Sequence, residues 1–371
     1  MSSLRLLLLI VSASIFALGL VMIFSTTSAE ILDHGMKPNT SLDKETHQAL
    51  VKQLLYAIAG GVLGGVAFRY GYHKLLQVSP VLLIFFSLLL LLVFVPGIGK
   101  EVNGSRRWIS LAGISFQPSE FVKYLVPMVF IQRVIMWKGK ALTFRSFLLG
   151  ILPLCVPLFL ILVEPNNGTV GVIVTTLVML FLLTEIPLKY WALPLVVVGI
   201  AGVGFASQLP YVKGRLQVYM NPELDIRGKG HQPHQAKIAS GSGGLLGKGP
   251  GNSWQKLSYL PEAQNDYIGA IYAEEFGFLG IMLLICLYMS FATIGFYTAG
   301  QSSDPGGFYL AAAVTFLIAF QAFMNLGVVS GLLPSTGLNL PLFSQGGSSL
   351  IANFTGLGIL QSIIGSGNKS G

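Results

Sequence analysis

Residues 79–96 read SPVLLIFFSLLLLLVFVP, a run of eighteen residues without a charged side chain. A helix needs about twenty apolar residues to cross the hydrocarbon core of a bilayer, because each residue adds about 1.5 Å to its length. Across the 371 residues of the chain, 53% are hydrophobic and only 10% are charged, which is far from the balance of a soluble domain. The run and the composition predict an all-α, polytopic integral membrane protein.

Similar apolar runs recur along the whole chain. They lie near residues 4–25, 50–68, 79–96, 118–136, 146–163, 167–183, 192–210, 275–298, 307–328 and 347–365. These runs predict ten membrane spans within a single domain, residues 1–371. Arg5 and the first run resemble a signal peptide, but many spans follow, so we expect the first run to be retained.

An even number of spans places both termini on one side of the membrane. Arg5 precedes the first run, whereas Glu30 and Asp33 follow it, and this order favours a cytoplasmic N-terminus. The cations of the other short loops favour the same orientation only by a small margin. Both termini are then expected in the cytoplasm, and the long polar segment 211–274 is expected on the outer side.

The chain carries a net charge of +8, from 23 Lys and Arg against 15 Asp and Glu. Basic and aromatic residues do not interleave on any polar module, so nucleic acid is not an expected partner. The expected partner is instead anionic lipid or a phosphate-bearing substrate. Cys155 and Cys286 both lie inside apolar runs, and they indicate neither a disulfide nor a metal site.

The polar segment 211–274 is the expected catalytic loop. Its charges are sorted along the sequence. The cations Lys213, Arg215, Arg227, Lys229, Lys237, Lys248 and Lys256 come first, with only Glu223 and Asp225 among them, and the carboxylates Glu262, Asp266 and Glu274 follow. This order suits a substrate with an anionic part to hold and a hydroxyl to deprotonate. A solvated loop whose charges only keep it in water remains an equally good interpretation.

Residues 228–251 of this loop contain eight glycines. A P-loop needs glycine five residues before its Gly-Lys pair and Ser or Thr directly after it, but here Ser242 and Gly249 occupy these positions. No nucleotide is therefore expected. Small residues still allow backbone N–H groups to approach a phosphate or sugar, with Lys248 adding charge, and a flexible surface loop is the alternative.

Asp266 directly precedes an apolar helix that we expect to begin near Ile268. At such a position partial burial raises the pKa of a carboxyl while the helix dipole lowers it, so Asp266 is a candidate proton acceptor. Aspartate is also a favoured N-cap residue. The two roles do not exclude each other.

A second polar motif, Gln117–Lys123, opens the fourth apolar run. Pro118 suits the first position of a helix, which places Glu120 and Lys123 three residues apart on one face. An unpaired charge is costly near a bilayer, so we predict an ion pair that faces a polar cavity. The alternative is that Lys123 extends to the membrane surface while Glu120 interacts with the helix dipole.

Residues 164–169 and 331–349 are two more irregular segments, punctuated by proline and glycine. Irregular backbone at membrane depth is tolerated only where it is buried in protein or lines a cavity. All these segments share the predicted outer side, so we expect them to form one site.

Together these motifs resemble the SEDS family (shape, elongation, division and sporulation), whose members polymerise peptidoglycan glycan strands from lipid II. The resemblance covers nearly the whole chain and is carried by residues 103–109, 117–123, 164–169, 230–280 and 331–349. Residues 251–263 and 337–341 are more similar to the division branch than to the elongation branch. The resemblance implies an inverting glycosyltransferase of the bacterial cytoplasmic (inner) membrane that uses no nucleotide-sugar donor.

The resemblance also implies roles for single residues. Asp266 would take the proton from the C4 hydroxyl of an acceptor N-acetylglucosamine as this hydroxyl attacks the anomeric carbon of the donor. Glu120 and Lys123 would form the family's supporting ion pair. Undecaprenyl pyrophosphate would leave, and the residues expected to bind substrate or pyrophosphate are Arg106, Arg107, Arg215, Gln232, Lys248, Lys256 and Ser348.

The cofactor implied by the resemblance is a divalent cation, Mg²⁺ or Mn²⁺. The implied partners are lipid II, the growing glycan strand, a class B penicillin-binding protein (a transpeptidase), other division proteins and membrane lipids. This chain departs from the family pattern at three places. Gln264-Asn265 replaces His-Thr, Asn166 replaces an aspartate and Gln345 replaces a tyrosine. These departures are compatible with a change in the properties of the catalytic base, in the substrate or in the partner, or with reduced activity.

Two other functions fit part of the pattern. A transporter that flips lipid-linked precursors needs sites reachable from both faces, whereas the polar motifs here cluster on the outer side. A non-catalytic scaffold of the division machinery fits the departures, but leaves Asp266 beside a basic loop unexplained. The sequence therefore favours a lipid II polymerase.

Overall fold

The computed structural model describes residues 2–33, 42–102, 105–111, 114–206, 214, 219–220, 230–257, 260 and 263–366. Each of the ten apolar runs falls largely within one helix: α1 (Ser2–Asp33), α2 (Leu42–Tyr70), α3 (Tyr72–Leu92), α4 (Ser119–Trp137), α5 (Phe144–Val163), α6 (Asn167–Leu183), α7 (Leu188–Ala206), α10 (Ile268–Gly300), α11 (Pro305–Val329) and α12 (Gly347–Ser366). The predicted fold class, an all-α polytopic membrane protein, is confirmed.

Seven helices in the described part of the chain are long and apolar enough to cross a membrane, namely α1, α2, α3, α5, α10, α11 and α12. The other three differ in charge or length. α4 contains Glu120, Lys123 and Arg133, while α6 and the apolar stretch Leu188–Val197 of α7 are shorter. The total of ten spans stays a prediction.

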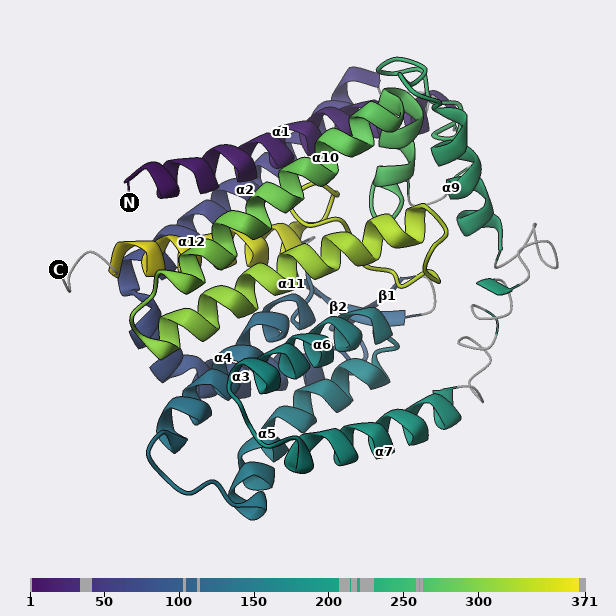
Figure 1. Ribbon diagram of the computed structural model, residues 1–371. Helices are drawn as coiled ribbons and strands as arrows, with labels where there is room; N and C mark the ends of the chain where they lie inside the picture. Colours follow the sequence, from purple (N-terminus) through teal and green to yellow (C-terminus); the bar gives the residue numbers. More distant parts are fainter. Residues whose placement is uncertain are drawn as a thin grey trace.

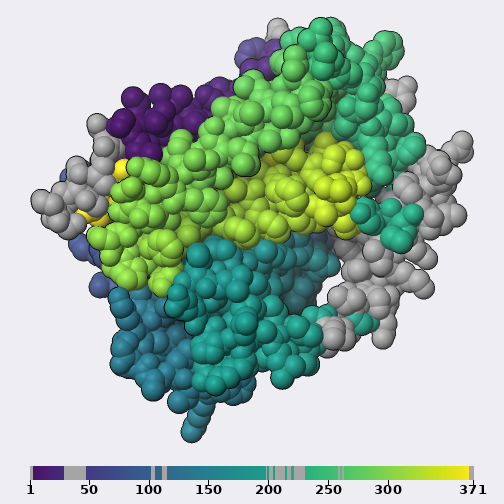
Figure 2. Space-filling model, in the orientation of Figure 1, coloured from purple at the N-terminus to yellow at the C-terminus, as the bar shows by residue number. Residues whose placement is uncertain are grey.

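The helices form two groups that run in about the same direction (Figure 1). One group consists of α1, α2, α10, α11 and α12, and the other of α3 to α7. Helices α4 and α11 contact each other where the two groups meet. In the space-filling view, α10 and α11 lie along one face between α1 and the teal helices of the second group (Figure 2).

Helices α2 and α12 approach each other very closely. A Cβ atom on Gly358 would lie 2.0 Å from the carbonyl oxygen of Gly64, so only glycine fits there. Gly60 contacts Phe354 one turn away. Small residues allow such close contact between membrane helices, where packing rather than hydrophobic burial stabilises the pair. This contact fixes α12, whose first turn belongs to the site.

A small antiparallel sheet precedes α4 and was not predicted. Its strands are β1 (Gly99–Val102), β2 (Ser105–Leu111) and β3 (Ile114–Phe116), in the order β1-β2-β3. Lys100 pairs with Trp108, and Ser110 pairs with Ser115. The sheet lies at the same end of the helix bundle as the short helix α9 (His231–Ser242) (Figure 1).

The start of α1 and the end of α12 lie together at the opposite end of the bundle (Figure 1). The Arg5 guanidinium donates to the carbonyl oxygen of Gln361 at 3.3 Å, and the Gln361 amide donates to the carbonyl oxygen of Arg5 at 3.0 Å. The start of α1 and the end of α12 are thus held together at one end of the bundle, and the side of the membrane on which they lie stays a prediction.

Candidate functional site

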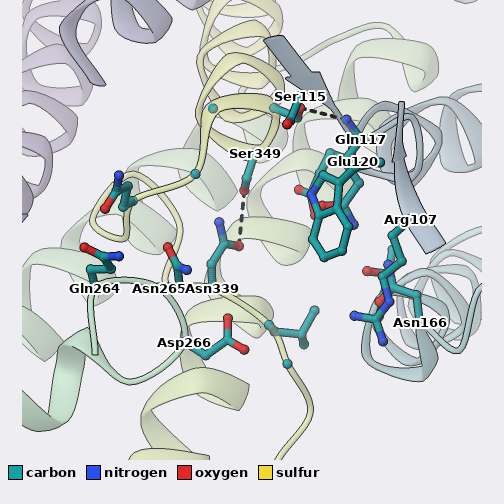
Figure 3. Close-up of a pocket in the computed structure, with 18 of the residues that line it drawn as sticks. Arg107, Ser115, Gln117, Glu120, Asn166, Gln264, Asn265, Asp266, Asn339 and Ser349 are labelled. Carbon is teal, nitrogen blue, oxygen red and sulfur yellow. Dashed lines mark hydrogen bonds between the residues drawn. The ribbon is translucent and has the colours of Figure 1, made fainter. Parts of the chain in front are cut away.

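A cavity of about 750 Å³ lies at the sheet end of the bundle. Its walls come from α2, the sheet, the first turn of α4, the start of α6, α9, the turn before α10, and residues 337–339 and 345–349. The irregular segments that we expected to share one site do meet here. Asp266 lies on one side of the cavity with Gln264 and Asn265, whereas Arg107 and Asn166 lie on the other (Figure 3).

Asp266 lies in the turn that leads into α10. The N-cap position of that helix is Tyr267, so Asp266 is not the N-cap. Its carboxylate lines the cavity, close to Gly337. A Cβ atom built on Gly337 would lie 3.8 Å from Asp266 Oδ2 and 3.9 Å from Arg107 Nη1. Gly337 therefore lies close to both the candidate proton acceptor and a cation.

Arg106 and Arg107 point to different environments because neighbouring residues of a strand face opposite sides. Arg107 lines the cavity, and its guanidinium donates to the backbone carbonyl oxygens of Glu164 and Pro165. Arg106 is half exposed and pairs with Glu101 at 3.1 Å. The structure thus places Arg107, and not Arg106, among the lining residues.

Glu120 and Lys123 form the predicted ion pair on α4, with 2.8 Å between Lys123 Nζ and Glu120 Oε2. Their side chains are only 8% and 2% exposed, which excludes the alternative in which Lys123 extends to the surface. Glu120 lines the cavity. Lys123 also donates to Gln321 Oε1 at 2.8 Å, and Gln321 donates to Asn339 Oδ1 at 2.7 Å. The pair therefore belongs to a buried polar network.

The remaining predicted substrate residues fall into three groups. Gln232 of α9 and Ser348 of α12 line the cavity, and Ser348 Oγ accepts a hydrogen bond from the backbone N–H of Gln117 at 2.9 Å. Lys248 and Lys256 are not among the lining residues. Arg215 lies outside the described residues.

Lys248 and Lys256 instead hold the polar loop against α10 and α1. Lys248 pairs with Glu274 at 2.6 Å, and Lys256 pairs with Glu275 at 2.8 Å. Ser25 of α1 donates to Glu275 at 2.7 Å. Lys248 and Lys256 thus pair with carboxylates of α10 and hold the loop in place. We had predicted that they bind pyrophosphate.

Gly277 explains how the glycine-rich segment reaches α10. Its φ of +65° interrupts the helix, and a Cβ atom on it would lie 2.3 Å from the backbone nitrogen of Gly247. Lys248 and Gly249 donate backbone hydrogen bonds to the carbonyl oxygens of Glu274 and Glu275, both at 3.0 Å. Several of the eight glycines thus serve backbone packing against α10.

Sequence reasoning missed several cavity residues. Lys52 and Lys100 line the cavity. From the sequence they were only two of the cations in the short loops, with no predicted role in the site. Gln321 belongs to the network through Lys123 but lies in an apolar run. A polar side chain in such a run was the available signal, because buried polar groups in membrane helices generally have a packing or functional role.

Carboxamide side chains dominate the polar lining of the cavity. They are Gln53, Gln117, Asn166, Gln232, Gln264, Asn265, Asn339 and Gln345. A carboxamide both donates and accepts hydrogen bonds without carrying charge, which suits the hydroxyl and acetamido groups of a sugar. All the positions at which this chain departs from the family pattern line this cavity, so the departures alter the substrate environment directly.

Asn166 also supports the local fold. Its Oδ1 accepts from the backbone nitrogen of Thr169 at 3.4 Å as the N-cap of α6. Its Nδ2 donates to Ser119 Oγ at 3.3 Å, next to Glu120. The asparagine therefore connects the first turns of α6 and α4.

Glu164, in the turn between α5 and α6, is fully buried. Both of its carboxyl oxygens lack a hydrogen-bond partner among the described residues. Burial raises the pKa of this carboxyl from its ordinary value of 4.5 to about 8, and the charge of Arg107 offsets part of that rise. Glu164 is therefore protonated at neutral pH in the folded protein.

This pKa predicts a pH-dependent stability. The unfolded chain releases the Glu164 proton above about pH 4.5 and the folded chain only above about pH 8, so the contribution of Glu164 to stability falls as the pH rises between these values. Glu164→Gln should therefore gain stability relative to wild type as the pH rises from 5 to about 8.5. Melting temperatures in detergent at both pH values test this. An equal difference at the two values would refute it.

A Gly337→Ala variant should lose activity by more than its strain explains. The φ of Gly337 is +74°, where alanine costs about 1–2 kcal/mol, and the methyl group would touch both Asp266 Oδ2 and Arg107 Nη1 in the cavity. We expect at least a tenfold loss of polymerisation. Gly139→Ala is the matched control, since Gly139 has a φ of +78° and open space around it. Equal activity losses in both variants would contradict the expected effect.

The comparisons with known proteins agree with this geometry. A family model described as "Cell cycle protein", named for FtsW, RodA and SpoVE, matches residues 5–368. The chain belongs to this family. The FtsW/RodA/SpoVE relatives include Stage V sporulation protein E of Bacillus subtilis, which is 35% identical over 361 residues, or 96% of each chain.

A second relative in the FtsW/RodA/SpoVE family is the probable peptidoglycan glycosyltransferase FtsW of Coxiella burnetii. It is 37% identical over 360 residues, which cover 95% of this chain and 94% of the relative. A chain from a solved peptidoglycan synthase complex has the same fold, with a TM-score of 0.74 at 24% identity over 98% of both chains. The resemblance drawn from the motifs is therefore confirmed, and the FtsW names support the division branch.

Proposed function

We propose that this protein is a peptidoglycan glycosyltransferase that polymerises lipid II into glycan strands during cell division. The observation that carries the proposal is the cavity with Asp266 on one side and Arg107 on the other. The match to the probable peptidoglycan glycosyltransferase FtsW of Coxiella burnetii covers 95% of this chain and 94% of that relative, which supports this activity for the whole chain. The membrane fold suits a substrate with a polyprenyl chain.

In the proposed reaction Asp266 accepts the proton of the C4 hydroxyl of an acceptor sugar. The hydroxyl oxygen forms a bond to the anomeric carbon of the donor, and the bond from that carbon to the diphosphate oxygen breaks. Undecaprenyl diphosphate leaves with the bonding electron pair. Arg107, Lys52 and Lys100 line the same cavity and would stabilise this charge. A positioned general base contributes about 10²–10⁴ in rate.

The expected divalent cation would need the substrate as a ligand. No group of three or more His, Cys, Asp or Glu side chains that could hold a metal occurs among the described residues. The carboxylates that line the cavity there are Asp266 and Glu120, and Glu120 is paired with Lys123. Mg²⁺ is commonly bound by one or two carboxylates together with substrate phosphates. The cavity thus offers few carboxylate ligands, so a cation there would be held mainly by the substrate diphosphate, whose charge it would neutralise.

Chelation should therefore lower polymerisation. We expect at least a tenfold loss in EDTA and recovery with Mg²⁺ or Mn²⁺. Without lipid II, we expect Mn²⁺ to bind only weakly, because the protein alone offers few ligands. Titration calorimetry with and without a lipid II analogue checks this. Full activity in EDTA, or tight Mn²⁺ binding to the free protein, would contradict it.

The proposed setting is the bacterial cytoplasmic membrane, with the cavity facing outward and both termini in the cytoplasm. The contact between Arg5 and Gln361 supports the part of this proposal that places both termini together, at the end opposite the cavity. The proposed partner is a class B penicillin-binding protein. Its support is the similarity to a chain of a peptidoglycan synthase complex in which polymerization and crosslinking are coordinated.

A lipid II flippase is the competing function, and two assays on one preparation separate the two. Purified protein with its transpeptidase is incubated with labelled lipid II in detergent, and polymer is resolved on a gel. The same protein in liposomes is tested for translocation of labelled lipid II. We expect polymer and no translocation. Translocation without polymer would favour the flippase, and neither activity from a folded complex would favour a scaffold.

A further inference from the structure

Helix α11 carries two buried carboxamides in an otherwise apolar stretch. Gln321 and Asn325 are each 1% exposed and lie four residues apart, so they face the same side of the helix. A buried polar side chain is retained at little cost only if its hydrogen bonds are satisfied. The partners of these two amides therefore indicate what they do.

Asn325 binds the main chain of the site on two separate segments. Its Nδ2 donates to the carbonyl oxygen of Asp266 at 2.8 Å and to the carbonyl oxygen of Leu338 at 2.7 Å. A carboxamide nitrogen has two hydrogens, and both are used. Its Oδ1 has no hydrogen-bond partner among the described residues. Among those residues, the side chain of Asn325 therefore makes only the two hydrogen bonds that its nitrogen donates.

These two bonds hold the main chain of Asp266 and the main chain next to Gly337. Leu338 directly follows Gly337, where an added Cβ atom would lie 3.8 Å from Asp266 Oδ2. The Asn325 amide thus binds both the backbone carbonyl of Asp266 and that of Leu338, the residue after Gly337.

Gln321 extends the connection to the other carboxylate of the cavity. It donates to the backbone carbonyl of Asn339 at 3.0 Å, and accepts from Lys123 at 2.8 Å. A continuous set of hydrogen bonds and one peptide segment therefore links the Glu120–Lys123 pair through α11 to Asp266. Buried hydrogen-bond networks of this kind favour a single arrangement of the groups that they join.

We propose that Asn325 is a positioning residue for the transfer reaction, which acts by holding the main chain of Asp266 at a fixed distance from residues 337–339. The proposal rests on the proposed function for its kinetic part. Displacing a catalytic group by about 1 Å can cost about 10²-fold in rate without loss of substrate binding. Asn325 itself does not line the cavity, so its effect should appear in kcat rather than in KM.

The test uses Asn325→Leu, which keeps the approximate side-chain volume and removes both hydrogen bonds. The matched control is Gln361→Leu, which removes another buried carboxamide at the far end of the bundle, where it binds the backbone of Arg5. Hydrogen–deuterium exchange of full-length protein in detergent is measured for residues 263–271 and 335–340. Steady-state polymerisation of labelled lipid II is measured on the same preparations.

Asn325→Leu should raise exchange in both segments and lower kcat by about 30- to 100-fold, with KM changed less than about threefold. Gln361→Leu should change neither. Unchanged exchange, or unchanged kcat in an active preparation, would overturn the proposal, as would an equal kcat loss in the control. If the wild type makes no polymer, the proposed function fails, and the exchange result by itself still decides whether Asn325 holds Asp266.

Discussion

A Lys123→Met variant should unfold at a much lower temperature than wild type. Lys123 and Glu120 are almost fully buried, and removal of the lysine leaves the Glu120 carboxylate without its cation. Breaking one side of a buried ion pair costs about 3–5 kcal/mol. The loss also removes the hydrogen bond to Gln321. Thermal and denaturant unfolding in detergent measure this effect.

The matched control for Lys123→Met is Arg106→Met. Arg106 pairs with Glu101, but both side chains are about half exposed, at 50% and 54%. Removal of an exposed pair costs about 0–1 kcal/mol. The double variant Glu120→Gln, Lys123→Met should recover much of the lost stability, because no charge is then left buried. Equal stability of Lys123→Met and Arg106→Met would show that the buried pair does not support the fold.

The second large effect is expected for Asp266→Asn. The amide has nearly the same shape as the carboxylate but cannot accept the C4 hydroxyl proton. Polymerisation should fall by about 10³-fold or more, at the upper range for loss of a general base. Binding of lipid II should remain within a few-fold of wild type. Both are measured on purified protein, by polymer formation and by binding of labelled lipid II.

Asp304→Asn serves as the control for this variant. Asp304 caps α11 at the end of the bundle away from the cavity, where its carboxylate accepts from the backbone nitrogen of Gly307 at 3.0 Å. The Asp304→Asn variant should lose some stability and keep its polymerisation activity. Polymer formation by Asp266→Asn at a wild-type rate would exclude Asp266 as the proton acceptor.

The helical fold was predictable from sequence because apolar runs near twenty residues leave few alternatives in a bilayer. The ends of helices were less predictable. We expected a span over 79–96, but α3 covers Tyr72–Leu92, since its first residues are too polar to register in a hydropathy pattern. The sheet over 99–116 escaped detection because its strands are short and two of its residues, Arg106 and Arg107, suggested only a basic motif.

The candidate site was partly predictable. Gln117–Lys123 placed the ion pair correctly, because spacing along a helix fixes which side chains meet. The roles of the lysines in the polar loop were harder to predict, because a cation in a loop can bind either a phosphate of a substrate or a carboxylate of the same chain. Only three-dimensional contacts show that Lys248 and Lys256 bind Glu274 and Glu275. Long-range partners of this kind leave no local signal.

The proposed function requires a substrate in the cavity that Asp266 and Arg107 line. The most direct measurement is a structure of the protein with its transpeptidase and a non-hydrolysable lipid II analogue together with an acceptor saccharide. We predict the acceptor C4 hydroxyl within about 2.6–3.2 Å of an Asp266 carboxylate oxygen, and the diphosphate beside Arg107. Sugars bound on another face, with Asp266 out of hydrogen-bonding reach of any hydroxyl, would contradict the account.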